Sequence, residues 1–150
     1  MKKILALGNI LLSDDGVAIY LADYLDKEFN SMGYEVIKCE KDTSYAISCI
    51  DEDDELVVID ASFTGGDSGR ILSMSLEEYR VKYYVNKAYG HSNTLFDYIF
   101  RNNSQCKGNV ILIEVCNMAL KDGLSEIMVE SFEKVAIEVL EKIENIKNVE

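Results

Sequence analysis

The sequence predicts an α/β fold, in which helices pack on a mostly parallel sheet. Short apolar runs of strand length alternate along the chain with longer segments whose apolar residues recur at helical spacing. No repeat, linker or low-complexity stretch interrupts this alternation, and 48% of the residues are hydrophobic. A chain of 150 residues with this composition can bury a core, so we expect residues 1–150 to form a single domain.

Each element follows from its local pattern. Continuous apolar runs predict strands at residues 4–7, 34–39, 56–60, 70–74 and 110–113. Helical periodicity predicts helices over residues 17–29, over 44–50, from about residue 94, and after Ser125, which is expected to cap the last helix. Residues 76–90 show no clear period. The link before residues 70–74 is too short for a crossover helix, so that strand should run antiparallel or lie at an edge.

The charge balance argues against two classes of partner. Fifteen Lys and Arg stand against 27 Asp and Glu, which gives a net charge of −12. Nucleic acids and anionic membranes are bound by basic patches, and the sequence has no Lys/Arg cluster of that kind. No apolar run approaches the roughly 18 residues of a membrane span. We therefore expect neither a nucleic-acid nor a membrane partner.

Cysteine usage and the N-terminal stretch bear on the compartment. The four cysteines lack the C-x-x-C spacing of zinc knuckles and redox pairs, so we expect them to be reduced and partly buried. The N-terminal stretch has two lysines before an apolar run but no small-residue cleavage site, unlike a signal peptide. Both observations predict a cytoplasmic protein.

Three side chains are placed to meet at one edge of the predicted sheet. Ligands of open α/β sheets bind at the carboxyl ends of the strands. The loop after the first strand contains Asp14 and Asp15, the third strand ends in Asp60, and the helix before the last strand begins near His91, the only histidine. Asp15, Asp60 and His91 together form an O/O/N set that suits a borderline divalent metal such as nickel or zinc.

Each of these residues also has a purely structural interpretation. Asp14 and Asp15 precede a helix, where capping and the helix dipole favour acidic side chains. Asp60 could cap the next loop by accepting hydrogen bonds from the amides of residues 62–66. A single histidine is more often a satisfied structural residue than a ligand, although a helix N-terminus would keep its ring neutral and able to ligate. The residues alone leave both interpretations open.

Four segments carry a resemblance to a known family. Residues 8–16 are G-N-I-L-L-S-D-D-G, residues 59–61 are I-D-A ahead of a Gly-rich turn, His91 precedes a helix, and Gly123-Leu124-Ser125 precedes the last helix. These segments resemble the hydrogenase maturation endopeptidases, whose N-terminal signature is G-x-G-N-x-L-x-x-D-(D/E)-G. The resemblance extends from residue 3 to about residue 143, nearly the whole chain.

The resemblance implies both a structure and a function. It implies a three-layer sandwich with a twisted, five-stranded mixed sheet that includes one antiparallel strand. It also implies that Asp15, Asp60 and His91 are the metal ligands and catalytic residues. In this family the metal is nickel carried by the precursor of a NiFe-hydrogenase large subunit, from which a short C-terminal peptide is removed. We expect this endopeptidase activity from a monomer, with another divalent metal such as zinc as the alternative to nickel.

Some positions depart from the family pattern. Ala6 stands in place of the first glycine of the signature, and residues 40–43 (E-K-D-T) replace D-G-G-(T/S). Residues 114–117 lack the proline that usually follows the last strand. None of these positions is a proposed ligand, so the departures affect the identity of the substrate more than the site.

Two other functions fit part of the pattern. A signalling receiver domain also has an acidic pair near the first strand and an Asp ending the third. In a receiver the acidic pair directly follows the strand and a Lys ends the fifth strand. Here six residues separate Gly8 from Asp15, and residues 114–117 contain no Lys. A non-catalytic nickel-binding assembly protein would carry the same ligands without cutting the precursor.

Overall fold

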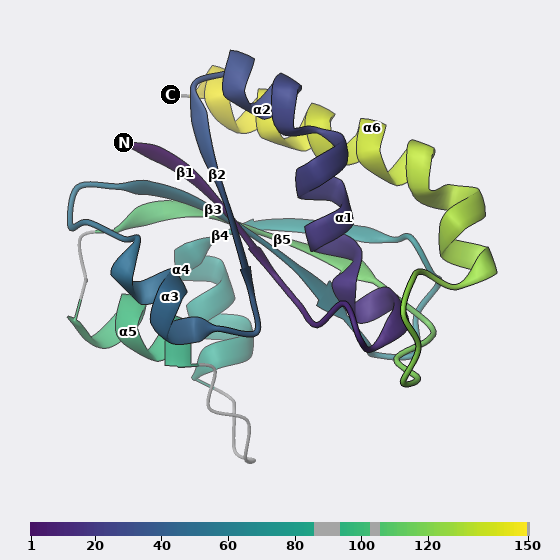
Figure 1. Ribbon diagram of the computed structural model, residues 1–150. Coiled ribbons are helices and arrows are strands. Elements are labelled where there is room, and N and C mark those ends of the chain that lie inside the picture. Colours follow the sequence, from purple (N-terminus) through teal and green to yellow (C-terminus); the bar gives the residue numbers. More distant parts are fainter. Residues whose placement is uncertain (86–93, 103–105, 150) are drawn as a thin grey trace.

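A five-stranded mixed sheet runs through the computed structural model (Figure 1), which describes residues 1–85, 94–102 and 106–149. The strand order is β2-β1-β3-β5-β4. Four strands are parallel, and β4 pairs antiparallel with β5 at the edge. The strands are β1 (Lys2–Leu7), β2 (Tyr34–Glu40), β3 (Glu55–Ser62), β4 (Ile71–Ser75) and β5 (Lys107–Glu114). The predicted strands are therefore confirmed, including the antiparallel edge strand.

Helices cover both faces of the sheet and complete the predicted three layers (Figure 1). Side chains of β1, β3 and β5 point alternately to the two faces and form two separate apolar clusters. One cluster packs under α1 (Val17–Tyr24), α2 (Asp26–Ser31) and α6 (Glu126–Val149). The other packs under α3 (Thr43–Ser48), α4 (Leu76–Tyr79) and α5 (Thr94–Asn102). Burial on both faces explains why these strands are continuous apolar runs.

The last helix follows the sequence prediction closely. The Ser125 hydroxyl accepts a hydrogen bond from the Met128 amide at 3.3 Å, which is the expected N-cap. The predicted apolar stripe faces the sheet, with Met128, Val135, Ala136, Val139 and Ile143 buried. No helix in the described part of the chain is long and apolar enough to span a membrane.

Two predictions need correction. The helix expected over residues 17–29 is broken at Leu25 (φ −103°, ψ 14°), which lies between α1 and α2. Both helices nevertheless keep apolar residues against the sheet, because Leu25 and Phe29 are buried. Residues 76–84, for which no element was predicted, form α4 and a π-helix, η2 (Arg80–Tyr84). A capping box between Ser75 and Glu78 begins α4, so the S-x-x-E sequence there was the overlooked signal.

Candidate functional site

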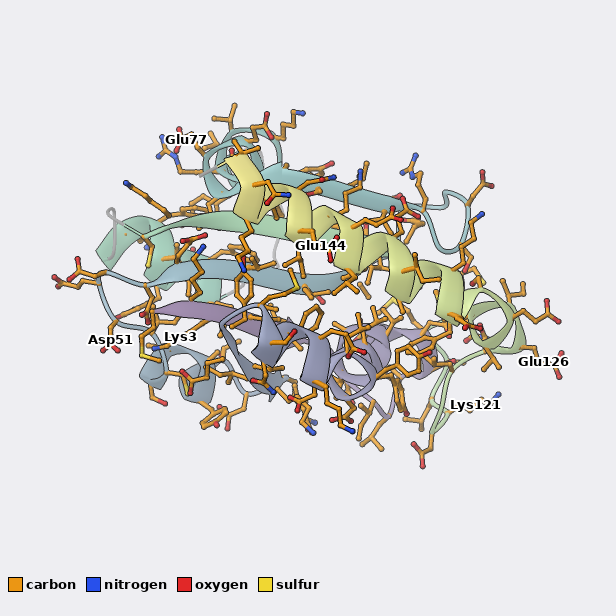
Figure 2. The ribbon with its side chains drawn as sticks, turned by 90° about the horizontal axis from the view of Figure 1, so that it is seen from above. Lys3, Asp51, Glu77, Lys121, Glu126 and Glu144 are labelled. Carbon is orange, nitrogen blue, oxygen red and sulfur yellow. The ribbon has the colours of Figure 1, made fainter. Side chains whose placement is uncertain are left out.

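The carboxyl ends of three parallel strands form one edge of the molecule. Ala6 of β1 pairs with Ile59 of β3, and Ser62 of β3 pairs with Glu114 of β5. The loops after these strands therefore emerge side by side. In Figure 2 this edge lies at the end marked by Lys121 and Glu126, opposite the end marked by Lys3 and Asp51. Asp15 and Asp60 both belong to this edge, as predicted from the strand ends.

A tight turn places Asp15 over the end of β1. Asp15 is partly exposed, and its Oδ2 accepts a hydrogen bond from the Asn9 amide at 2.8 Å. Gly8 makes the turn with φ +136°, and a Cβ at Gly8 would lie only 2.1 Å from the Asp15 carbonyl oxygen. Only glycine fits such an approach. Ala6, where the sequence departs from the signature, is a buried residue inside β1.

The neighbouring carboxylate, Asp14, has a structural role. Asp14 is fully buried, and its two oxygens accept hydrogen bonds from the Ser125 amide and the Ser125 hydroxyl, each at 2.7 Å. The Asp14 amide donates to the Asn117 carbonyl at 3.1 Å. Asp14 therefore stabilises the start of a helix, as its structural interpretation proposed, but the helix is α6 and not the adjacent α1. The short 3-10 helix η1 (Ser13–Gly16), which carries Asp15, is thereby fixed to the start of α6.

Ser13 takes a strained conformation at the start of this turn. Its φ is +49°, in the left-handed region that non-glycine residues seldom adopt. Its hydroxyl is buried without a hydrogen-bond partner among the described residues. The Ser13 amide donates to the Lys121 carbonyl at 2.9 Å, and the Lys121 amide donates to the Leu11 carbonyl at 3.0 Å. Strain is thus tolerated where the loops after β1 and β5 are joined.

Asp60 lies near the carboxyl end of β3, partly exposed. Its Oδ1 accepts a hydrogen bond from the Ala61 amide at 2.8 Å. By strand alternation Asp60 shares a face with Val58, which packs under α4 and α5. Burial raises the pKa of Tyr79 in α4 to about 12, and the negative charge of Asp60 adds to this shift. A protonated phenol therefore accompanies the Asp60 carboxylate on this side of the sheet.

The sequence analysis missed Glu114, which holds the loop after Asp60. Glu114 is 2% exposed, and its Oε1 accepts hydrogen bonds from the Thr64 amide (2.7 Å), the Thr64 hydroxyl (2.9 Å) and the Gly66 amide (2.9 Å). Burial raises the pKa of Glu114, but these hydrogen bonds outweigh it and leave the pKa below its usual value. The amides of residues 64 and 66, which Asp60 could have capped, are thus bound by Glu114.

His91 lies outside the described residues. The helix expected after it is α5, which begins at Thr94. Within the part of the chain that the structure describes, no group of three or more His, Cys, Asp or Glu side chains is arranged to hold a metal ion. The described part contributes two partly exposed carboxylates, Asp15 and Asp60, at one edge. Such oxygens can ligate a divalent cation or accept a proton from water.

Comparisons with known proteins identify the fold. No family model and no curated protein matches the sequence. The HybD endopeptidase of E. coli superposes with a TM-score of 0.76 at 18% identity, covering 96% of this chain and 92% of its own. The HybD protease of Thermococcus kodakarensis gives a TM-score of 0.68 at 20% identity, covering 95% and 97%. The chain has the fold of the hydrogenase maturation proteases.

Other solved structures support the same assignment of fold. The HycI protease of Thermococcus kodakarensis matches with a TM-score of 0.69 at 19% identity, over 95% of this chain and 92% of its own. The protease fold also separates the chain from the receiver alternative. Flavodoxin-like receivers have the parallel strand order 2-1-3-4-5, whereas here the antiparallel β4 gives 2-1-3-5-4.

Proposed function

We propose that this chain is an endopeptidase that removes a C-terminal peptide from the nickel-loaded precursor of a NiFe-hydrogenase large subunit. The observation that carries the proposal is the position of Asp15 and Asp60 on adjacent strand ends of a maturation-protease fold. The G-N-x-L-x-x-D-D-G segment, which builds the turn around Asp15, supports it further. His91 is proposed as the third ligand, on its match to the family histidine.

The proposed mechanism uses the metal of the substrate. Asp15, Asp60 and His91 bind the nickel ion of the precursor, which fixes the scissile peptide against the strand-end edge. Nickel polarises the peptide carbonyl, and a water molecule activated at the metal or by a carboxylate attacks the carbonyl carbon. Among the described residues Asp15 Oδ1 accepts no hydrogen bond, so this oxygen is available for a metal or a proton. The amine of the released peptide takes up a proton as the bond breaks.

The oligomeric state, the number of domains, the compartment and the classes of partner are proposed from the sequence. A monomer of one domain acts on the precursor in the cytoplasm, without nucleic acid or membrane as partner. All four cysteines are unpaired, which agrees with a reducing compartment. Because nickel arrives with the substrate, the protease does not need a permanent ion of its own.

The decisive experiment is a processing assay with site variants. Asp15→Ala, Asp60→Ala and His91→Ala are incubated with the nickel-loaded large-subunit precursor of the same organism, and mass spectrometry reads its C-terminus. The wild type is expected to shorten the precursor, and each variant is expected to leave it intact. Asp67→Ala is the control, since Asp67 is an exposed carboxylate in the loop after β3.

Nickel binding is measured separately on the same proteins. Normal processing by the Asp60→Ala and His91→Ala variants would contradict the proposal. A wild type that binds the nickel-loaded precursor but leaves its length unchanged would favour the non-catalytic assembly protein instead.

A further inference from the structure

Three exposed apolar side chains stand on the loops that surround the two carboxylates. Leu11 is 51% exposed in the loop after β1, Phe63 is 60% exposed after β3, and Leu120 is 85% exposed after β5. We call these three residues the apolar rim. A single exposed Leu or Phe is common on protein surfaces. An exposed apolar side chain on each of the three adjacent loops after β1, β3 and β5 is a less common arrangement than isolated exposure.

The sheet brings the rim residues to one edge. β1, β3 and β5 are consecutive neighbours, so the outer two of these strands are separated by roughly 10 Å. Leu11 and Leu120 are also linked directly, because the Lys121 amide donates to the Leu11 carbonyl at 3.0 Å. Leu11 precedes Asp15 by four residues, and Phe63 follows Asp60 by three. Leu11 and Phe63 therefore lie within four residues of Asp15 and Asp60 in the chain.

Each rim loop is fixed by its own polar contacts. The Asn9 side-chain oxygen accepts from the Leu11 amide at 3.0 Å. The buried Glu114 carboxylate binds the amide of Thr64, next to Phe63. The side-chain oxygen of Asn117 accepts from the Ala119 amide at 2.9 Å, next to Leu120. The apolar side chains are thus presented on ordered loops, which lowers the entropy cost of binding a partner there.

We infer that the apolar rim binds apolar side chains of the precursor polypeptide on both sides of its nickel centre. This inference rests on the proposed function and names the surface by which the substrate is held. Asp15 and Asp60 offer negative charge to a cation at the centre of the edge, and the rim offers apolar contact around it. The nickel ion of the precursor complements the negative charge, and apolar side chains of the polypeptide that carries it would complement the rim.

The test compares rim variants with a matched control. A triple variant, Leu11→Ala, Phe63→Ala and Leu120→Ala, is compared with a double variant, Ile137→Ala and Val149→Ala. The control side chains are 56% and 89% exposed on the later turns of α6, beyond the first turn that contacts Asp14 through Ser125. Processing of the nickel-loaded precursor is followed at several precursor concentrations. Removing the three rim side chains together is expected to raise KM at least tenfold, because burial of even one Leu or Phe supplies about that much affinity.

The outcomes distinguish this inference from the proposed function. If the rim variant raises KM at least tenfold with kcat unchanged, and the α6 control does not, the inference is supported. If the wild type processes the precursor and the rim variant has an unchanged KM, the rim inference fails while the function stands. If the wild type binds the precursor without cutting it, the same comparison is made with Kd. If it neither binds nor cuts, both proposals are overturned.

Discussion

Replacing Asp14 by alanine is expected to destabilise the fold rather than remove a metal ligand. Asp14 is fully buried, and both of its oxygens accept hydrogen bonds of 2.7 Å from Ser125 at the start of α6. A hydrogen bond to a charged group contributes about 1.5–3 kcal/mol. The carboxylate regains hydration on unfolding, which offsets part of the gain from two such bonds. We therefore expect Asp14→Ala to lower the free energy of unfolding by about 3 kcal/mol.

A double-mutant cycle with Ser125 isolates the contact. Ser125→Ala removes one hydrogen bond to Asp14 and the cap on the Met128 amide, so it should cost about 2 kcal/mol. The double variant should cost about 1.5 kcal/mol less than the sum of the single variants, because they share one interaction. Urea unfolding followed by circular dichroism measures all three. An Asp14→Ala variant within about 0.5 kcal/mol of the wild type would refute the reasoning.

Three further predictions concern other positions. Gly8→Ala should lower Tm and abolish processing, because its Cβ would collide with the Asp15 carbonyl. Gly123→Ala is the control, since Gly123 also has a positive φ (+97°) but lies in open space, so this variant adds backbone strain without a collision. A Gly8→Ala enzyme with unchanged Tm and processing would contradict the geometry. Burial raises the pKa of Asp54, but hydrogen bonds from Lys3 (2.6 Å), the Met1 amino group and the Asp51 amide together outweigh it and lower that pKa from 3.8 to about 2. The stabilisation that follows from this lowered pKa is present above pH 4 and is lost as the pH falls towards 2. Asp54→Asn should therefore flatten that part of the curve of unfolding free energy against pH. A curve that the substitution leaves unaltered would exclude Asp54 and its partners as the source of this pH dependence. Glu114→Ala should speed hydrogen exchange of the two loop amides it binds at least tenfold, and equal exchange would show that the carboxylate does not order the loop.

The strands and their positions could be predicted because burial on both faces leaves a local signature. Val57, Val58 and Ile59 are fully buried on alternate faces of β3, which requires a continuous apolar run. The antiparallel edge strand followed from a short link. The break at Leu25 has no such signature, because apolar residues continue at nearly helical spacing through α1 and α2. The π-helix at residues 80–84 likewise has no pattern that separates it from irregular chain.

The positions of the candidate site residues could be predicted where they depend on strand ends and not where they depend on distant partners. Asp15 and Asp60 follow from the rule that ligands gather at the carboxyl ends of parallel strands. The role of Asp14 depends on Ser125, 111 residues later in the chain. The role of Glu114 depends on Thr64, 50 residues earlier. Sequence neighbours carry no information on such pairs, so each carboxylate could only be given a local interpretation.

The most direct test of the central claim is the dependence of processing on nickel in the substrate. The wild-type protein is incubated with the large-subunit precursor prepared with and without nickel, and mass spectrometry follows the C-terminus of each. If Asp15, Asp60 and His91 bind the substrate's metal, only the nickel-loaded precursor will be shortened. Equal cleavage of the two precursors would contradict a site that recognises nickel.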